Sequence, residues 1–208
     1  NSIFLEIFFK SIQTNRFKSP LIIIVSKKLL KEQMKSLGFI YKINTIDKNF
    51  NHFDKLDNKK INLIDVKYKF NKCFEKISKK SNKYIEETFE VALKILHKNK
   101  FSKLINGPIS KKHFLKGRVL GITEYLAQKT IKNNNIAMLI FNKKLSVSPI
   151  TTHVALKDVH THISKKKIYN QVKLITNFYK KKFKIKPKIA VTGLNPHCES
   201  NFKNCEED

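Results

Sequence analysis

The sequence predicts an α/β fold, with a mostly parallel sheet, helices on both of its faces and one antiparallel pair of strands. Short runs rich in Ile and Val alternate with stretches whose apolar residues recur at helical spacing. The connections are short, and the 208 residues include only five Gly and five Pro, so we expect no long flexible linker. A hydrophobic content of 41%, with 16 Phe, is enough for a sizeable core.

The first third of the chain alternates helices and strands. The run SPLIIIVS is short and β-branched, which predicts a strand buried on both faces. The next apolar stripe is helical, and Gly38 just beyond it is typical of a helix C-cap. In chain order we expect a helix at 3–13, a strand at 19–26, a helix at 27–37, a strand at 39–46, a loop at 47–60 and a strand at 61–66.

The remainder continues the alternation. Ser81 is a good N-cap for a long helix, and Glu86 and Glu87 follow near its positive end. Two later strands are close enough to form a hairpin around Asn142 and Lys143. After the helix at Ser81 we expect a strand at 102–107, helices at 110–116 and 123–132, strands at 135–141 and 144–152, a helix at 164–181 and a strand at 187–195.

The formal net charge is +27, and nearly all of the positive charge is lysine. A basic chain can bind nucleic acid or an anionic surface. Here the lysines are spread along the whole sequence, and arginine, the better bidentate reader of phosphate and guanine, occurs only at Arg16 and Arg118. We therefore interpret the lysines as a solvated surface and do not expect a nucleic-acid partner.

The cysteines indicate a reducing compartment. Cys73, Cys198 and Cys205 are an odd number without a CxxC pair, which does not suit a disulfide framework. No run reaches the roughly 18 apolar residues of a membrane span, so we expect a cytoplasmic protein with no membrane partner. The chain does not begin with Met and ends just after a motif, from which we expect the N-terminal portion of a longer protein.

Polar residues gather where three of the expected strands end. These segments are Asn106–Lys111, Thr151–His153 and Asn195–His197. In open α/β sheets, ligands bind outside the carboxyl ends of the strands, so we expect the three segments to meet at one edge. There is neither a GxGxxG fingerprint nor a P-loop, so a nucleotide would have to be held in another way.

Two histidines in these segments are candidate metal ligands. Neutral imidazole is the commonest protein ligand for a transition metal, and a catalytic site of the zinc type needs about three protein ligands. His153 and His197 would supply two, and the third could be Glu199, Cys198 or a residue beyond the end of the chain. The alternative is that each is a hydrogen-bonded structural histidine.

Four ordered motifs resemble those of the 4-hydroxythreonine-4-phosphate dehydrogenases of vitamin B6 (pyridoxal phosphate) synthesis. They are INGPISKKHFLKG, GITEYLAQ, TTHVALKDV and VTGLNPHCE. The resemblance implies an α/β/α sandwich like that of isocitrate and isopropylmalate dehydrogenases, with two lobes and a homodimeric assembly. The chain at 1–208 would then be the N-terminal portion of such an enzyme, incomplete at its C-terminus, with the lobe boundary within it left open.

The resemblance also implies a reaction and its site. The family oxidises 4-phosphooxy-L-threonine with NAD and decarboxylates the product to 3-amino-2-oxopropyl phosphate, assisted by a divalent metal such as zinc, magnesium or cobalt. His153 and His197 match two of the family's three metal-binding histidines. The family's substrate-binding His-Thr pair falls at Ile122 and Thr123. Isoleucine can neither donate a hydrogen bond nor shuttle a proton, so the base would have to be a residue beyond position 208, or Lys111.

Two alternatives stay open. Ile122 suggests a related dehydrogenase that acts on another phosphorylated hydroxy acid, such as phospho-threonate or a four-carbon sugar acid. The +27 charge suggests a basic nucleic-acid-binding protein on a retired enzyme scaffold. Turnover measured on a panel of phosphorylated hydroxy acids tests the first alternative. The salt dependence of nucleic-acid binding tests the second.

Overall fold

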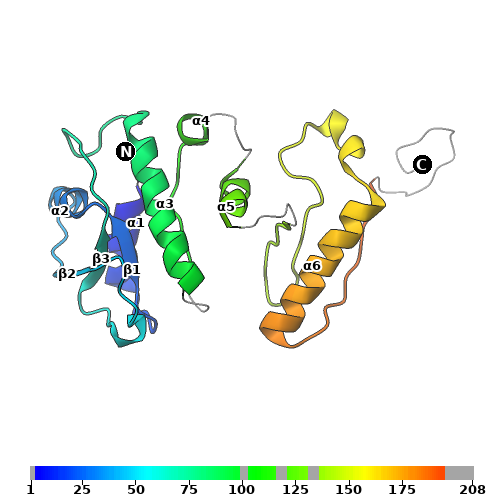
Figure 1. Ribbon diagram of the computed structural model, residues 1–208, viewed down its shortest axis with the longest axis horizontal. Coiled ribbons are helices and arrows are strands. Elements are labelled where there is room, and N and C mark those ends of the chain that lie inside the picture. Colours follow the sequence, from blue (N-terminus) through cyan, green and yellow to red (C-terminus); the bar gives the residue numbers. More distant parts are fainter. Residues whose placement is uncertain (1–2, 99–102, 116–120, 131–135, 195–208) are drawn as a thin grey trace. The chain divides into compact units, whose positions relative to one another are not determined.

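The computed structural model describes residues 3–98, 103–115, 121–130 and 136–194. The chain forms two compact units, Asn1–Arg118 and Val119–Asp208, which are described separately (Figure 1). The elements of the first unit are α1 (Phe4–Thr14), β1 (Ile22–Val25), α2 (Lys27–Ser36), β2 (Ile43–Ile46), η1 (Phe53–Lys55), β3 (Ile61–Asp65), α3 (Lys80–Lys98) and α4 (Lys111–Phe114). Those of the second are α5 (Ile122–Thr130), η2 (Leu156–Asp158), η3 (His160–His162) and α6 (Lys165–Phe183).

The first unit is built on a three-stranded parallel sheet with the order β1-β3-β2. Leu63 pairs with Ile23 on one side and with Thr45 on the other. Because β3 is the central strand, four of its five residues are buried, whereas β1 buries alternate residues. The expectation that 19–26 is buried on both faces therefore holds for β3 rather than for β1.

Helices α1 and α2 close the core over this sheet. Phe9, Leu30 and Leu63 are fully buried in one apolar cluster with Leu5 and Ile23. Burying a side chain of this size contributes about 1.5–3 kcal/mol relative to leaving it exposed. The long helix α3 packs along β1, and its buried Phe89 lies 6.1 Å from the ring of Phe114 (Figure 1).

The helix ends follow sequence signals with one correction. Ser26 caps α2 by accepting a hydrogen bond from the backbone N–H of Leu29, and Gly38 beyond the helix has a φ of +74°, as expected of a C-cap. The N-cap predicted at Ser81 is wrong, because α3 begins at Lys80 and the Ser81 hydroxyl donates back to the carbonyl of Ser78 at 2.8 Å.

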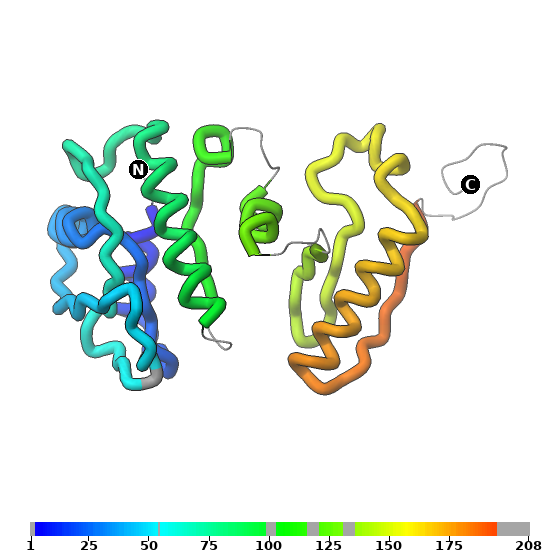
Figure 2. The backbone as a smooth tube through the Cα atoms, in the orientation of Figure 1, coloured from blue at the N-terminus to red at the C-terminus, as the bar shows by residue number. Residues whose placement is uncertain are grey.

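The second unit is organised around α6, which begins after its N-cap Ser164. The segment 136–149 runs beside this helix (Figure 2), and aromatic side chains join the two, with Phe141 stacked on Phe183 at 5.2 Å. Ile140 and Val147 form one antiparallel bridge, so the predicted hairpin exists around its expected turn. The α/β fold class, with a parallel sheet and an antiparallel element, is confirmed.

Several predicted strands are wrong within the described residues. Residues 103–107, 136–139 and 187–194 have no strand assignment, and the hairpin of 135–141 and 144–152 has a single bridge rather than a ladder. A strand needs a neighbour that pairs with its N–H and C=O groups, and an apolar run alone does not supply one. Consistent with this, Leu145 and Val191 are 75% and 59% exposed.

None of the helices in the described part of the chain combines the length and apolar character that crossing a bilayer requires.

Candidate functional site

Two of the sequence motifs meet in the second unit. The GITE segment begins α5, and the TTH segment follows the hairpin. The hydroxyl of Thr152 donates a hydrogen bond of 3.3 Å to Oε1 of Glu124. A Cβ added to Gly121 would lie 2.6 Å from Oε2 of Glu124 and 3.5 Å from Nε2 of His153. The start of α5 and the end of the TTH segment therefore share one small space, which the absent side chain of Gly121 leaves open.

The backbone at His153 is unusual for a non-glycine residue. Its φ is +57°, in the left-handed region that side chains rarely adopt. The side chain is exposed, whereas Thr152 before it is half-buried. Residues held in sparsely populated backbone conformations persist where the surroundings fix them, and they cluster at functional sites.

The hairpin and α6 hold the TTH segment in place. Buried Gln171 of α6 donates hydrogen bonds from Nε2 to the hydroxyl of Ser148 at 2.8 Å and to the carbonyl of Pro149 at 2.9 Å. Tyr179, two turns later, donates to the hydroxyl of Ser146 at 2.9 Å. These contacts fix the chain immediately before Thr151, so the position of His153 depends on α6.

The structure places some of the predicted site residues together. Ile122 and Thr123 are the first two residues of α5, half-buried and exposed respectively, in the same unit as His153. His197 lies outside the described residues, as do Cys198 and Glu199. The segment Asn106–Lys111 belongs to the first unit, so the meeting of three strand ends at one edge stays a prediction.

Glu124 is a candidate site residue that sequence reasoning missed. Its Oε2 is buried and has no hydrogen-bond partner among the described residues. The available signal was its place in the first turn of a helix, directly after the expected substrate-binding pair. Such a place favours a carboxylate through the helix dipole, which by itself indicates no particular function.

A divalent metal can be tested against these residues. The described parts of the chain contain no group of three or more His, Cys, Asp or Glu side chains close enough to hold an ion. They do present an exposed imidazole at His153, and its Nε2 borders the same open Cβ position of Gly121 as the carboxylate of Glu124. Metal-binding histidines often have a carboxylate partner. Among the described residues, His153 would therefore fit as one ligand of a metal site.

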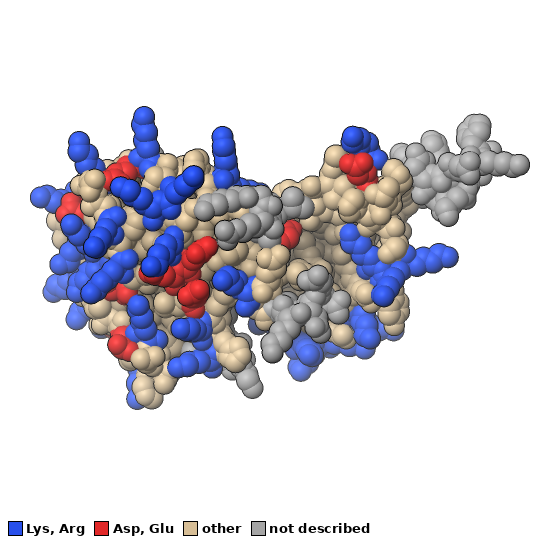
Figure 3. Space-filling model, turned by 45° about the horizontal axis from the view of Figure 1, so that its top comes forward, with Lys and Arg blue, Asp and Glu red and all other residues tan. Residues whose placement is uncertain are grey.

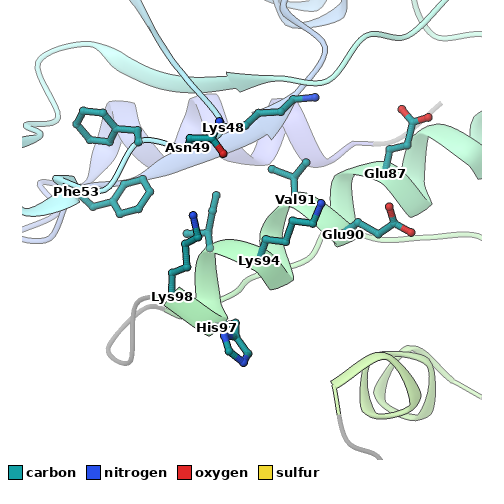
Figure 4. Close-up of a pocket in the computed structure, with 11 residues that line it drawn as sticks. Lys48, Asn49, Phe53, Glu87, Glu90, Val91, Lys94, His97 and Lys98 are labelled. Atoms are coloured by element: carbon teal, nitrogen blue, oxygen red, sulfur yellow. The ribbon is translucent and has the colours of Figure 1, made fainter.

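One cleft lies away from these residues. It has a volume of about 500 Å³ and is in the first unit, between the loop after β2 and α3. Figure 4 shows Lys48, Asn49 and Phe53 on one side and the side chains of α3, including Lys94 and Lys98, on the other. None of the predicted site residues lines it, so we do not assign it to the predicted chemistry.

Neither the face shown in Figure 3 nor the described cysteine, Cys73, offers a competing site. On the face shown in Figure 3, lysines are scattered across both units and interleaved with acidic residues. Burial and, second, the charge of Glu32 raise the pKa of Cys73 above its ordinary value. Because the thiolate is the reactive form, Cys73 is poorly suited to be a nucleophile.

Comparison with known proteins identifies the family. Residues 16–208 match the family described as pyridoxal phosphate biosynthetic protein PdxA. The chain is 39% identical over 183 residues to the 4-hydroxythreonine-4-phosphate dehydrogenase of Sulfurihydrogenibium sp. (strain YO3AOP1), an alignment that covers 86% of this chain and 55% of the relative. It is 29% identical over 196 residues to the same enzyme of Wigglesworthia glossinidia brevipalpis, with 92% and 58% covered.

The fold comparison agrees. The crystal structure of 4-hydroxythreonine-4-phosphate dehydrogenase from Klebsiella pneumoniae superimposes with a TM-score of 0.78 at 21% identity, covering 95% of this chain and 62% of that one. The chain thus spans a little over half the length of the curated relatives it matches. On the family match and these relatives, the chain belongs to the family of the pyridoxal phosphate biosynthetic protein PdxA.

Proposed function

We propose that the chain is part of an NAD-dependent 4-hydroxythreonine-4-phosphate dehydrogenase, acting in the cytoplasm in pyridoxal phosphate synthesis. Its relatives carry that enzyme's name. The single observation that supports the proposal most is the contact of the two motif segments. The hydrogen bond from Thr152 to Glu124 holds His153 beside the first turn of α5, which contains Thr123.

The proposed substrate is 4-phosphooxy-L-threonine. A hydride leaves its hydroxyl-bearing carbon for the nicotinamide of NAD, and the hydroxyl proton leaves to a base. The β-keto acid then loses carbon dioxide, and protonation of the resulting enol gives 3-amino-2-oxopropyl phosphate. Bound at the substrate hydroxyl, a divalent cation would lower the pKa of that hydroxyl.

The residues of this chain would have distinct roles. His153 would contribute one imidazole nitrogen to the cation, and His197 a second. Thr123, exposed in the first turn of α5, would donate a hydrogen bond to the substrate. Ile122 would provide only apolar contact, so the base that receives the hydroxyl proton must be another residue. We propose a homodimer as the working assembly.

The activity is tested on the complete product of the reading frame, with NAD, Zn²⁺, Mg²⁺ or Co²⁺, and phosphooxythreonine. We expect NADH to form, and we expect His153→Ala and His197→Ala to weaken metal binding tenfold or more. His160→Ala is the matched control, because His160 is also an exposed histidine of the second unit. A folded product that makes no NADH with any of these metals contradicts the proposal.

The second candidate is a dehydrogenase for another phosphorylated hydroxy acid. It is favoured by Ile122, which stands where the family's substrate-binding histidine would be and is half-buried at the start of α5. Replacing a hydrogen-bonding contact by an apolar one changes which substrates a site accepts. Turnover measured with phosphooxythreonine, phospho-threonate and phosphorylated four-carbon sugar acids separates the two candidates by their kcat/KM values.

A further inference from the structure

Glu124 has one carboxylate oxygen that the fold uses and one that it does not. Oε1 accepts the hydroxyl of Thr152 at 3.3 Å. Oε2 is buried and lacks a hydrogen-bond donor within the described residues. Leaving a buried charged acceptor without a donor costs about 1–3 kcal/mol or more, so such an oxygen calls for a partner.

The geometry around Gly121 points to that partner. Gly121 is buried, and the position that its Cβ would take lies 2.6 Å from Oε2 of Glu124 and 3.5 Å from Nε2 of His153. Both atoms therefore border the same small space. No hydrogen bond or ion pair joins these two side chains in the described part of the chain, so a rotation of either side chain has to bring an imidazole N–H to Oε2.

We propose that Glu124 is a positioning residue for His153. Its Oε2 accepts an N–H of the imidazole, which fixes the tautomer and the orientation of the ring and leaves the other ring nitrogen free. The part of the proposal that concerns the cation rests on the proposed function, because the free ring nitrogen is the one that would bind the divalent ion. Carboxylate partners of metal-binding histidines act in this way, by orienting the ring and raising its basicity.

The burial of the two side chains assigns them different roles. Oε2 of Glu124 is buried, whereas the side chain of His153 is exposed. A cation that arrives from solvent therefore reaches the imidazole and not this oxygen. The positive φ of His153 sets the direction of its Cα–Cβ bond, so the carboxylate has the side-chain torsions χ1 and χ2 left to set.

The pair is tested without metal or substrate, by NMR of the 208-residue chain labelled with ¹⁵N in histidine. Spectra are taken at about pH 8.5, where an ordinary imidazole is neutral and its two ring ¹⁵N shifts report the tautomer. We expect one tautomer of His153 to exceed the other about tenfold, as a charge-assisted hydrogen bond predicts. In Glu124→Ala the ratio should fall to that of a free imidazole.

Two further variants separate positioning from a general loss of structure. Gly121→Ala keeps the charge of Glu124 but places a Cβ 2.6 Å from its Oε2, the far end of a flexible side chain that can swing away. It should change the tautomer ratio as Glu124→Ala does while the chain stays folded. Asp158→Ala is the matched control, since it removes an exposed carboxylate from the same unit. A His153 tautomer ratio that Glu124→Ala leaves unchanged overturns the proposal.

Calorimetry with Zn²⁺ on the complete product of the reading frame then links the pair to the cation. We expect Glu124→Ala to weaken the affinity about tenfold or more and Asp158→Ala to leave it unchanged. If His153→Ala weakens zinc binding but Glu124→Ala does not, the positioning role is overturned and the proposed metal site stands. If the tautomer depends on Glu124 but His153→Ala leaves zinc affinity unchanged, the pair stands and the proposed metal site fails.

Discussion

The backbone N–H of Ser26 donates a hydrogen bond of 2.9 Å to the hydroxyl oxygen of Tyr84. Ser26 directly follows β1 and is 2% exposed, and Tyr84 is in the second turn of α3. The bond therefore attaches the longest helix of the first unit to the carboxyl end of an edge strand of its sheet. Asp65 reinforces the same corner, because its Oδ1 accepts the N–H of Lys27 at 2.7 Å.

Because of Tyr84, the free energy of unfolding should change with pH in the alkaline range. Burial raises the pKa of Tyr84 from 10.0 to about 12, against the hydrogen bond from Ser26, which lowers it. The folded state therefore keeps the phenol proton that the unfolded chain releases near pH 10. The stability from Tyr84 is fully present below about pH 10 and is lost as the pH rises through about 12, by up to about 2–3 kcal/mol.

Urea unfolding of wild type and Tyr84→Phe at about pH 9 and about pH 12 measures this contribution. Lysine deprotonation acts on both proteins and cancels in the difference. The variant should be less stable at the lower pH by about 1–3 kcal/mol, because the buried N–H of Ser26 loses its acceptor. That gap should close at the higher pH. A gap that stays constant would show that Tyr84 keeps its ordinary pKa.

Gly107→Ala should destabilise the first unit. A Cβ at this position would overlap Cγ of Phe4 and lie 2.7 Å from its Cβ, at the start of α1. Those atoms are close to the backbone and cannot swing aside, so the helix or the loop must shift, at a cost of about 1–3 kcal/mol. Thermal unfolding should show a clearly lower Tm for the variant.

The matched control is Lys103→Ala, an exposed position in the same segment, which should leave the Tm within error. In a Phe4→Ala background the Gly107→Ala change should cost less, because Cγ and the ring of Phe4 are gone and its Cβ is the one close atom that remains. Full additivity of the two substitutions would mean that the contact does not limit the packing of α1.

Local signals in the sequence predicted the elements from α1 to β3 well. Their apolar periodicity and caps such as Ser26 and Gly38 are signals that lie within or beside each element. The strands expected at 102–107, 135–141 and 187–195 are absent over residues 103–107, 136–139 and 187–194 for a physical reason. Pairing is a property of two segments, and an apolar run such as the one ending in Val191 cannot indicate whether a neighbour is present.

The candidate site was predicted mainly from the resemblance of its motifs to a known family, and only partly from physical reasoning about the fold. His153 and Thr123 were identified from the resemblance, and strand-end reasoning also indicated His153. Glu124 was missed because its significance lies in burial of one oxygen and in the open space at Gly121, and neither can be seen in a sequence. The position of His197 remains a prediction.

Ile122→His should separate the two candidate substrates. The new imidazole would stand beside Thr123 at the start of α5 and restore a hydrogen-bonding group. If phosphooxythreonine is the substrate, kcat/KM should rise about tenfold or more, as general acid–base groups contribute at least that much. If another acid is the substrate, the variant should lose activity on it. Ile122→Leu is the control, and equal effects of His and Leu would exclude a hydrogen-bonding role at this position.

Gln171→Ala should loosen the segment that leads to His153. The substitution removes the donors to Ser148 and Pro149 and leaves a cavity at a buried position of α6. We expect a loss of about 1–3 kcal/mol in unfolding free energy. Because these contacts precede Thr151, the hydrogen bond from Thr152 to Glu124 should also weaken, and the tautomer preference of His153 should fall with it.

The control is Asn177→Ala, which removes an exposed amide from the same helix and should change neither the unfolding free energy nor the tautomer ratio. A variant that loses stability while keeping the tautomer ratio of wild type would show that α5 alone, without α6, holds the imidazole in place.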